Sequence, residues 1–425
     1  MSPRKLFHSS SMLLLGLSML PAAAADWSQW RGPSRDGRAP FVAPAAWPEK
    51  PARQWRMVVG EGHSSPVVAG DRVFVFSRQG EEEELRALAL ADGREIWKAA
   101  YPAPYQMHPA AIPHGKGPKS TPVVAEGKVC AFGISGILSC YAAADGKLAW
   151  RHDFSKMLGS ADAFFGSSAS PLVEAGTLYL NIGSDSQGSF RAFDLATGAT
   201  RWDTPGLKPA YASAMLYEIG GRRQIVTLTF DAIVGLDQAT GKVLWQQPYV
   251  DQYRQKTPTP LRVGDLLFFG NIDNGSFGAR LQGEGAAMKL QTVWKDEQNS
   301  WYMTSPVSDG RRIYAFTDKQ KGQLLVVKPE TGAVLWKSPG RQGENASLAL
   351  AGELLLMVDT DGELTVWKTG DQPQLLRTYT IAESPVWASA AWTEKLMVVK
   401  DRDGVAAFSF AAGGPAAAER RPAAN

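Results

Sequence analysis

The sequence predicts an all-β, eight-bladed β-propeller built from four-stranded antiparallel blades. Three observations support this prediction: a Gly-x-x-x-Trp motif recurs along the chain, strand-length runs alternate with Gly-rich turns, and short Ser-, Thr- or Ala-rich segments begin similar units. Self-similarity at a period of about 20–50 residues is typical of solenoids and propellers. A repeat fixes the scaffold, however, and leaves the activity to be argued from a site.

The Gly-x-x-x-Trp motif marks the end of each repeat. Five copies occur: Gly93–Trp97, Gly146–Trp150, Gly198–Trp202, Gly241–Trp245 and Gly332–Trp336. Two copies extend to Asp-x-x-Thr-Gly, at 194–198 and 237–241. We expect the Gly to adopt a positive φ in a turn, because it lacks a Cβ atom that would clash there.

The third unit shows the internal order of a repeat. Strand-length runs at 170–173, 177–182, 189–194 and 199–202 are separated by Gly-rich turns. No segment after the first residues shows sustained helical periodicity. Four antiparallel strands in sequence make one propeller blade.

The tryptophans are predicted to pack between neighbouring blades, where a large ring fills the wedge between two sheets. Removing such a ring costs about 3–5 kcal/mol. This structural role is expected for Trp55, Trp97, Trp150, Trp202, Trp245 and Trp336. It outweighs a role of these rings in ligand binding.

Eight strand starts predict eight blades. They lie at 64–66, 120–122, 168–171, 212–214, 257–260, 304–306, 346–347 and 388–390. The fifth unit has a longer hairpin before Trp294, the seventh ends in Tyr379 instead of Trp, and the eighth ends near Phe410 after three strands. Trp55 lies 42 residues before Trp97, so the strand around it is expected to complete the eighth blade. Such closure removes exposed sheet edges.

The chain divides into four predicted regions. Residues 1–25 read as a signal peptide, with a charged start, an apolar stretch too short to span a bilayer and a small-residue cleavage site. Residues 26–52 form an N-terminal extension, 53–410 the propeller, and 411–425 a low-complexity tail predicted to be disordered. No Cys follows the cleavage site to accept a lipid anchor. We therefore expect a monomeric periplasmic or secreted protein without a transmembrane segment in the mature chain.

Charge and cysteine content narrow the partners. The formal net charge is only +3, which argues against a nucleic-acid partner, because such a partner requires a basic stripe. Cys130 and Cys140 flank a predicted hairpin turn and would lie directly opposite each other. An oxidising compartment permits a disulfide between them. A pair of buried free thiols is equally compatible with the sequence.

The repeat carries a family resemblance. Asp-x-x-Thr-Gly-x-x-x-Trp resembles the docking repeat of pyrroloquinoline-quinone (PQQ)-like propellers, the quinoprotein alcohol dehydrogenase-like superfamily, from about Trp55 to Phe410. The segment 27–37, Trp-Ser-Gln-Trp-Arg-Gly-Pro-Ser-Arg-Asp-Gly, resembles the start of secreted bacterial PQQ-like repeat proteins. The superfamily contains quinoprotein dehydrogenases and cofactor-free propellers, among them the propeller lipoprotein of the outer-membrane β-barrel assembly machinery.

The resemblance implies two alternatives for function. The dehydrogenase branch implies PQQ with Ca²⁺, a vicinal Cys–Cys disulfide and an Asp base, but this chain has no Cys-Cys pair, and no base or Ca²⁺ ligand set could be mapped onto it. The first hypothesis is therefore a non-catalytic propeller without a predicted cofactor, which binds an envelope protein or small ligand at its channel mouth or rim. The alternative is a PQQ-dependent dehydrogenase of alcohols or sugars.

A binding site is predicted on the face where the strand starts open. Two long connections, 101–117 and 154–166, lie on this face, and functional residues concentrate on such loops. Candidate ligand-binding residues around the mouth are His63, His108, His114, Lys119, Lys256, Tyr302 and Trp387. The competing interpretation is that strand-start Ser, Thr and Asn residues satisfy backbone groups while the aromatic rings cap the core. His108 and His114 match no standard zinc spacing, so no metal site is predicted.

Overall fold

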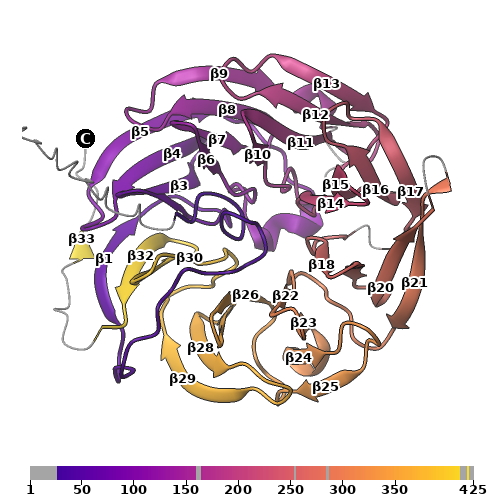
Figure 1. Ribbon diagram of the computed structural model, residues 1–425. Coiled ribbons are helices and arrows are strands. Elements are labelled where there is room, and N and C mark those ends of the chain that lie inside the picture. Colours follow the sequence, from indigo (N-terminus) through magenta and orange to yellow (C-terminus); the bar gives the residue numbers. More distant parts are fainter. Residues whose placement is uncertain (1–25, 159–163, 253–254, 284–286, 412–418, 421–425) are drawn as a thin grey trace, which may run out of the picture.

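Sheets follow one another around a ring, with the chain running from the inner to the outer strand of each blade (Figure 1). The computed structural model describes residues 26–158, 164–252, 255–283, 287–411 and 419–420. Seven sheets have four strands, and the eighth consists of β30, β31, β32, β1 and β33. The predicted eight-bladed propeller is thus confirmed. The predicted signal peptide and nearly all of the predicted disordered tail lie outside the described residues.

The strand bounds follow the predicted order. Blade 1 contains β2 (Val67–Ala69), β3 (Arg72–Gln79), β4 (Glu82–Ala89) and β5 (Glu95–Pro102), and blade 2 contains β6 (Val123–Ala125), β7 (Lys128–Phe132), β8 (Ile137–Ala142) and β9 (Leu148–Asp153). Blade 3 contains β10 (Leu172–Glu174), β11 (Thr177–Gly183), β12 (Gly188–Asp194) and β13 (Thr200–Pro205), and blade 4 contains β14 (Met215–Ile219), β15 (Arg222–Leu228), β16 (Ala232–Asp237) and β17 (Val243–Pro248). Blade 5 contains β18 (Leu261–Val263), β19 (Leu266–Asn271), β20 (Gly275–Gln282) and β21 (Lys289–Asp296), and blade 6 contains β22 (Val307–Ser308), β23 (Ile313–Thr317), β24 (Gln323–Val327) and β25 (Val334–Lys337). Blade 7 contains β26 (Ala346–Ala351), β27 (Leu354–Asp359), β28 (Glu363–Lys368) and β29 (Gln374–Thr380). Blade 8 contains β30 (Ala391–Trp392), β31 (Leu396–Lys400), β32 (Gly404–Ser409), β1 (Ala52–Val58) and β33 (Glu419–Arg420).

Helical structure is confined to short 3-10 turns among the described elements: η1 (Pro109–His114), η2 (Ser155–Met157) and η4 (Lys319–Lys321). Within this part of the chain, no helix has the length and apolarity needed to cross a membrane.

The burial of each strand follows its place in the blade. All seven residues of β11 are buried, whereas the outer strand β13 has no buried residue. Middle strands are covered on both faces by the neighbouring blades, so they read as continuous apolar runs instead of alternating ones. The hydrophobic core is therefore a series of clusters between adjacent blades.

The N-terminal strand β1 closes the ring, as predicted. It pairs antiparallel with β32, so the first and last parts of the propeller lie side by side (Figure 1). Arg56 on β1 forms a buried ion pair with Asp401, with 3.0 Å between Nη2 and Oδ2. On the other side, Trp55 donates its indole N–H to the Leu90 carbonyl of blade 1 at 2.8 Å. The closing strand is thus held to both neighbouring blades.

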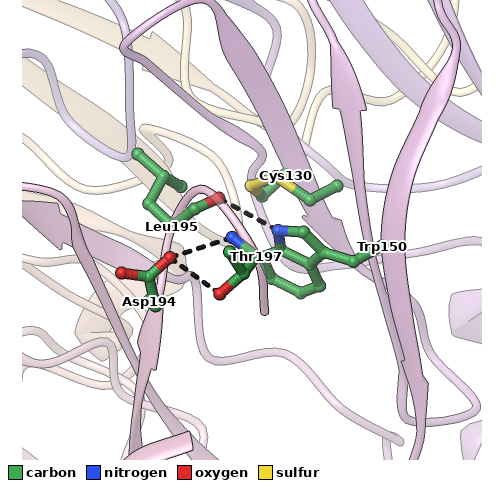
Figure 2. The surroundings of a disulfide bond; sticks show 6 residues. Cys130, Trp150, Asp194, Leu195 and Thr197 are labelled. Atoms are coloured by element: carbon green, nitrogen blue, oxygen red, sulfur yellow. Dashed lines mark hydrogen bonds between the residues drawn. A yellow bond between two sulfur atoms is a disulfide. The ribbon is translucent and has the colours of Figure 1, made fainter. Parts of the chain in front are cut away.

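The tryptophans connect consecutive blades through a repeated pair of contacts. Trp150 of blade 2 donates its indole N–H to the Leu195 carbonyl of blade 3 at 2.9 Å, and its ring lies against Gly198 (Figure 2). Asp194 fixes this turn by accepting bonds from the Thr197 N–H and hydroxyl, each at 2.9 Å. The same arrangement joins Trp55 to Leu90 and Gly93, Trp97 to Ala143 and Gly146, Trp202 to Gln238 and Gly241, and Trp294 to Pro329 and Gly332.

Each Gly of the motif therefore receives the Trp of the preceding blade. Two tryptophans depart from this pattern, because the sequence of the next blade lacks the Gly-x-x-x-Trp motif. Trp245 lies against Gly235 of its own blade and donates to Gln224 Oε1 at 2.8 Å. Trp336 packs against Trp367, with ring centroids 5.7 Å apart.

Strand-start hydroxyls form a second set of contacts between blades, near the channel. Ser170 Oγ accepts the Thr121 N–H at 3.0 Å, and Ser213 Oγ accepts the Ser170 N–H at 2.9 Å. Across the closure, Ser65 Oγ accepts the Ser389 N–H at 2.9 Å. The interpretation that these hydroxyls satisfy backbone groups is correct for these positions.

Cys130 and Cys140 are directly opposite each other on β7 and β8 and form a disulfide. The bond lies in the core between blades 2 and 3, beside Trp150 (Figure 2). Of the two alternatives compatible with the sequence, the structure contains the disulfide.

Candidate functional site

The strand-start face carries a pocket at the channel mouth, with a volume of about 150 Å³. Its lining comes from strand starts, from the two long connections and from the N-terminal extension. The lining residues are Trp30, His63, His114, Lys119, Phe165, Ser168, Ser170, Tyr211, Ser213, Gln255, Thr257, Met303, Asn345 and Trp387. Of the seven predicted ligand-binding residues, His63, His114, Lys119 and Trp387 meet here.

Aromatic rings form a continuous wall along one side of this mouth pocket. The Phe165 ring lies 5.5 Å from the Tyr211 ring and 5.1 Å from the His114 ring, both edge-to-face. His114 in turn contacts Trp387 edge-to-face at 5.6 Å, and His63 lies 6.0 Å from Trp387. Edge-to-face contacts are a favourable geometry for aromatic rings. The wall therefore joins both long connections to the last blade.

Both histidines of the wall are held in the neutral form at neutral pH. His63 Nε2 lies 2.9 Å from the His114 carbonyl, to which it donates. Burial lowers the pKa of His63 to about 3, and the positive charges of Lys119 and Lys400 act in the same direction. Burial also lowers the pKa of His114. Neither ring contributes positive charge to the pocket.

Lys119 supplies the positive charge of the pocket lining. Its Nζ donates to the Gly115 carbonyl at 3.3 Å, and no carboxylate of the described residues lies within 4.0 Å of it. Burial lowers the pKa of Lys119 to about 8, while the more distant Glu61 and Glu83 carboxylates oppose this shift. The ammonium is thus charged at neutral pH, and no ionic partner for it occurs in the part of the chain that the structure describes.

The structure corrects the prediction for Lys256. Its ammonium is fully buried and pairs with Asp251 Oδ1 at 2.8 Å, and it also donates to the Phe230 carbonyl at 2.7 Å. Lys256 does not line the pocket. The sequence places a lysine at this strand start, but it does not show that Asp251, five residues earlier in the same loop, pairs with it.

The two remaining candidates lie beside the pocket. Tyr302 donates its hydroxyl to Gln255 Oε1 at 3.0 Å, so it positions a lining residue. The His108 ring stacks on Phe164 at 4.3 Å, where the two long connections touch. Neither of these two rings is part of the lining itself.

The N-terminal extension contributes to the pocket, which the sequence did not predict. The segment from Trp27 crosses the middle of the ring (Figure 1) and pairs with Val68 of the inner strand β2. Trp30 lines the pocket and donates to Thr259 Oγ1 at 3.0 Å. Both tryptophans of the segment 27–37 thus have a structural use.

Buried arginines anchor the segment 27–37, here termed the plug, to several blades. Arg35 donates to the carbonyls of Pro171 at 2.7 Å, Ser170 at 3.2 Å and Ala214 at 3.1 Å. Arg31 donates to the Pro306 carbonyl on the far side of the ring at 2.5 Å. A rigid guanidinium fork can bond several carbonyls at once. The extension is therefore an integral part of the channel.

A comparison with protein-family models identifies the family to which the chain belongs. A family model described as the outer membrane protein assembly factor BamB matches residues 81–338, more than half of the chain. The chain belongs to this BamB family. A search of curated proteins found no match.

Solved structures of BamB and of dehydrogenases share the fold. BamB from Moraxella catarrhalis superposes with a TM-score of 0.61 at 16% identity, covering 86% of this chain and 99% of that chain. The quinohemoprotein alcohol dehydrogenase ADHIIG from Pseudomonas putida HK5 gives a TM-score of 0.55 at 13% identity, with coverages of 94% and 82%. A europium-containing methanol dehydrogenase gives 0.52 at 11% identity, with coverages of 91% and 90%. At these identities the likeness concerns the fold alone.

The mouth pocket of this BamB-family chain does not fit PQQ with Ca²⁺. PQQ bears three carboxylates, whereas the described lining offers one ammonium and two neutral histidines. Calcium requires six to eight oxygen ligands with carboxylates among them, and the lining contains no Asp or Glu. Among the described residues, no group of three or more His, Cys, Asp or Glu is arranged to hold a metal. The disulfide lies between blades 2 and 3 and not in this pocket.

Proposed function

We propose that this protein is a non-catalytic binding propeller of the cell envelope, which takes a partner protein or an envelope component at the mouth pocket. The observation that carries the proposal is a pocket with an aromatic wall and the ammonium of Lys119, which has no carboxylate of the described residues within 4.0 Å. Concave, mostly apolar sites with a few polar groups are typical ligand sites. Its chemistry suits recognition, because the lining that the structure describes contains no Asp or Glu to pair with a base.

The family description adds a direction for the partner. It names outer membrane protein assembly, and we carry this to the chain as a proposal: the partner is a component of the outer membrane or of its assembly apparatus. The leader predicted at residues 1–25 supports delivery to the periplasm. The alternative is a PQQ-dependent dehydrogenase.

One experiment separates the proposal from this alternative. Purified mature protein is titrated with PQQ and Ca²⁺ and assayed for dye-linked oxidation of alcohols and sugars. We expect neither saturable binding nor turnover. Micromolar PQQ binding accompanied by turnover would overturn the non-catalytic function.

A second experiment tests the location of binding. A photo-crosslinking amino acid replaces Met303, which lines the pocket, or Lys147, an exposed residue in the β8–β9 turn on the opposite face. We expect a discrete crosslinked product in envelope preparations from the Met303 variant and none from the Lys147 variant. Equal products from both positions would contradict binding at the mouth.

A further inference from the structure

We propose that the mouth pocket binds a small aromatic monocarboxylate, with the ring against the aromatic wall and the carboxylate on the ammonium of Lys119. This inference deepens the proposed function and rests on it, because it names the ligand class of the same pocket. Three properties of the described lining carry it: one unpaired cation, a set of rings and the absence of other free charges.

The unpaired cation calls for an anion. Burying a charge without a partner is costly, so buried charges in proteins are paired or hydrogen-bonded. Lys256, the other strand-start lysine of this face, follows that rule through its 2.8 Å contact with Asp251. Lys119 lines the cavity, and the bond that the described residues offer it is the 3.3 Å contact with the Gly115 carbonyl. A carboxylate entering the pocket would supply the missing ionic partner.

The aromatic rings of the lining favour a ligand whose anionic group is attached to a flat apolar ring. Trp30 forms the floor and Trp387 lies on the wall, joined to Phe165 and Tyr211 through the edge-to-face contacts described above. The Trp30 indole is held by its bond to Thr259, so this surface is preformed. Offset-stacked and edge-to-face contacts between rings contribute about 0.5–1.5 kcal/mol beyond simple burial.

Several other polar residues of the lining already use an acceptor atom within the protein. Ser170 and Ser213 accept backbone bonds from the preceding blades, Asn345 Oδ1 accepts from Thr304, and Gln255 Oε1 accepts from Tyr302. His63 donates to a carbonyl. The serine, asparagine and glutamine bonds occupy acceptor atoms and leave the hydroxyl and amide donors of the same residues, which can bond a carboxylate as Lys119 does. The charge of the described lining matches one carboxylate.

The test titrates the purified mature protein with 2-naphthoate and its neutral isostere 2-naphthamide, followed by tryptophan fluorescence and calorimetry. We expect 2-naphthoate to bind with a Kd of about 1 mM or tighter, and 2-naphthamide to bind at least about tenfold more weakly, the effect of losing one charged hydrogen bond. Decahydronaphthalene-2-carboxylate, which keeps the charge without the ring, is also expected to bind more weakly. Equal binding of either analogue would overturn the inference.

Variants assign the charge to one side chain. Lys119→Met is expected to weaken 2-naphthoate binding at least about tenfold, since it removes the ionic partner. Lys116→Met is the matched control. Lys116 lies three residues away and pairs with Glu81 at 3.3 Å, so its replacement should change the affinity of the protein for 2-naphthoate by no more than about twofold. An unchanged affinity in Lys119→Met would contradict the proposal.

A pH series on the unmodified protein gives a readout that needs no folded variant. The ammonium form binds the anion, so affinity should fall about tenfold per pH unit above about 8, where Lys119 loses its proton. The carboxylates that act on Lys119 are Glu61 and Glu83. Of the two neutral histidines beside it, His63 also faces Lys400 and His114 also faces Glu344. Lys400 also has a pKa near 8, but it bonds the Gly62 and Asp401 carbonyls, and Lys119→Met should abolish the pH dependence.

The outcomes distinguish this inference from the proposed function. Failure of every naphthalene probe to bind would overturn the ligand class, while a crosslink at Met303 would still support binding at the mouth. Absence of that crosslink together with tight, Lys119-dependent naphthoate binding would support the ligand class and argue against a macromolecular partner.

Discussion

The indole ring of Trp97 in blade 1 lies directly on Gly146 in blade 2. A Cβ atom at Gly146 would lie 2.6 Å from Trp97 Cε3, and the residue has a φ of 74°. The same indole donates its N–H to the Ala143 carbonyl at 3.0 Å. The glycine is thus required twice, by its own backbone and by the ring of the preceding blade.

Replacing this glycine should cost more than its φ alone explains. Gly146→Ala is expected to lower the free energy of unfolding by about 2–4 kcal/mol, through left-handed strain and the clash with Trp97. Gly127→Ala is the matched control, because Gly127 in the same blade has a φ of 72° and a Cβ atom added there would meet nothing within 4 Å. It should cost about 1 kcal/mol. Urea denaturation measures both, and equal losses would refute the docking argument.

The docking tryptophans should differ in their contribution to stability. Trp150→Ala removes a buried ring and its 2.9 Å bond to Leu195, so we expect a loss of about 3–5 kcal/mol. Trp336 is less buried and has no glycine platform in the next blade. Its replacement by Ala should cost less, about 1–3 kcal/mol. Thermal and chemical unfolding of the two variants provide the comparison, and a reversed order would contradict it.

The plug should depend on its most buried arginine. Arg35→Met leaves three carbonyls without their donor, and we expect a loss of about 2–4 kcal/mol. Arg38→Met is the control, since Arg38 is more exposed and makes one backbone bond, to Ser308 at 2.9 Å. It should cost below about 1 kcal/mol. If both variants unfold alike, the extension is not anchored as described.

Removing the disulfide should weaken the propeller moderately. The bond closes a loop between residues ten apart in sequence, for which chain entropy predicts about 2–3 kcal/mol. We expect the double variant Cys130→Ala with Cys140→Ala to unfold at lower urea concentration by that amount. Unfolding of the unmodified protein with and without reductant is the companion measurement. A reductant effect that persists in the double variant would show another cause.

Acid should destabilise the mouth through His63. Its pKa is about 3 in the folded protein and near 6.5 in the unfolded chain. Its contribution to stability is fully present above pH 6.5 and is lost as the pH falls toward 3, because the unfolded chain then binds a proton that the folded protein does not. The slope is at most about 1.4 kcal/mol per pH unit. His63→Gln should flatten stability against pH between 6.5 and 4.5, and an unchanged slope would contradict this assignment.

The sequence predicts where the site lies, but it does not determine which of the candidate residues line the pocket. His63, His114, Lys119 and Trp387 were expected at the mouth because strand starts and long connections open on one face, and they line the pocket. Lys256 occupies an equivalent strand start yet pairs with Asp251. Periodicity places a side chain on a face but does not say which charge a loop brings beside it.

The sequence by itself determined the ring. Recurring Gly and Trp residues report contacts that repeat between neighbouring units, so eight blades and the closing strand around Trp55 follow from counting them. Only the tertiary structure decided that Trp30 of the N-terminal extension and Trp387 of the last blade line the same pocket. These residues are 357 positions apart in the chain. They come together because the ring closes and because the N-terminal extension runs into the channel. The extension occurs once in the chain, so no sequence period predicts where it lies.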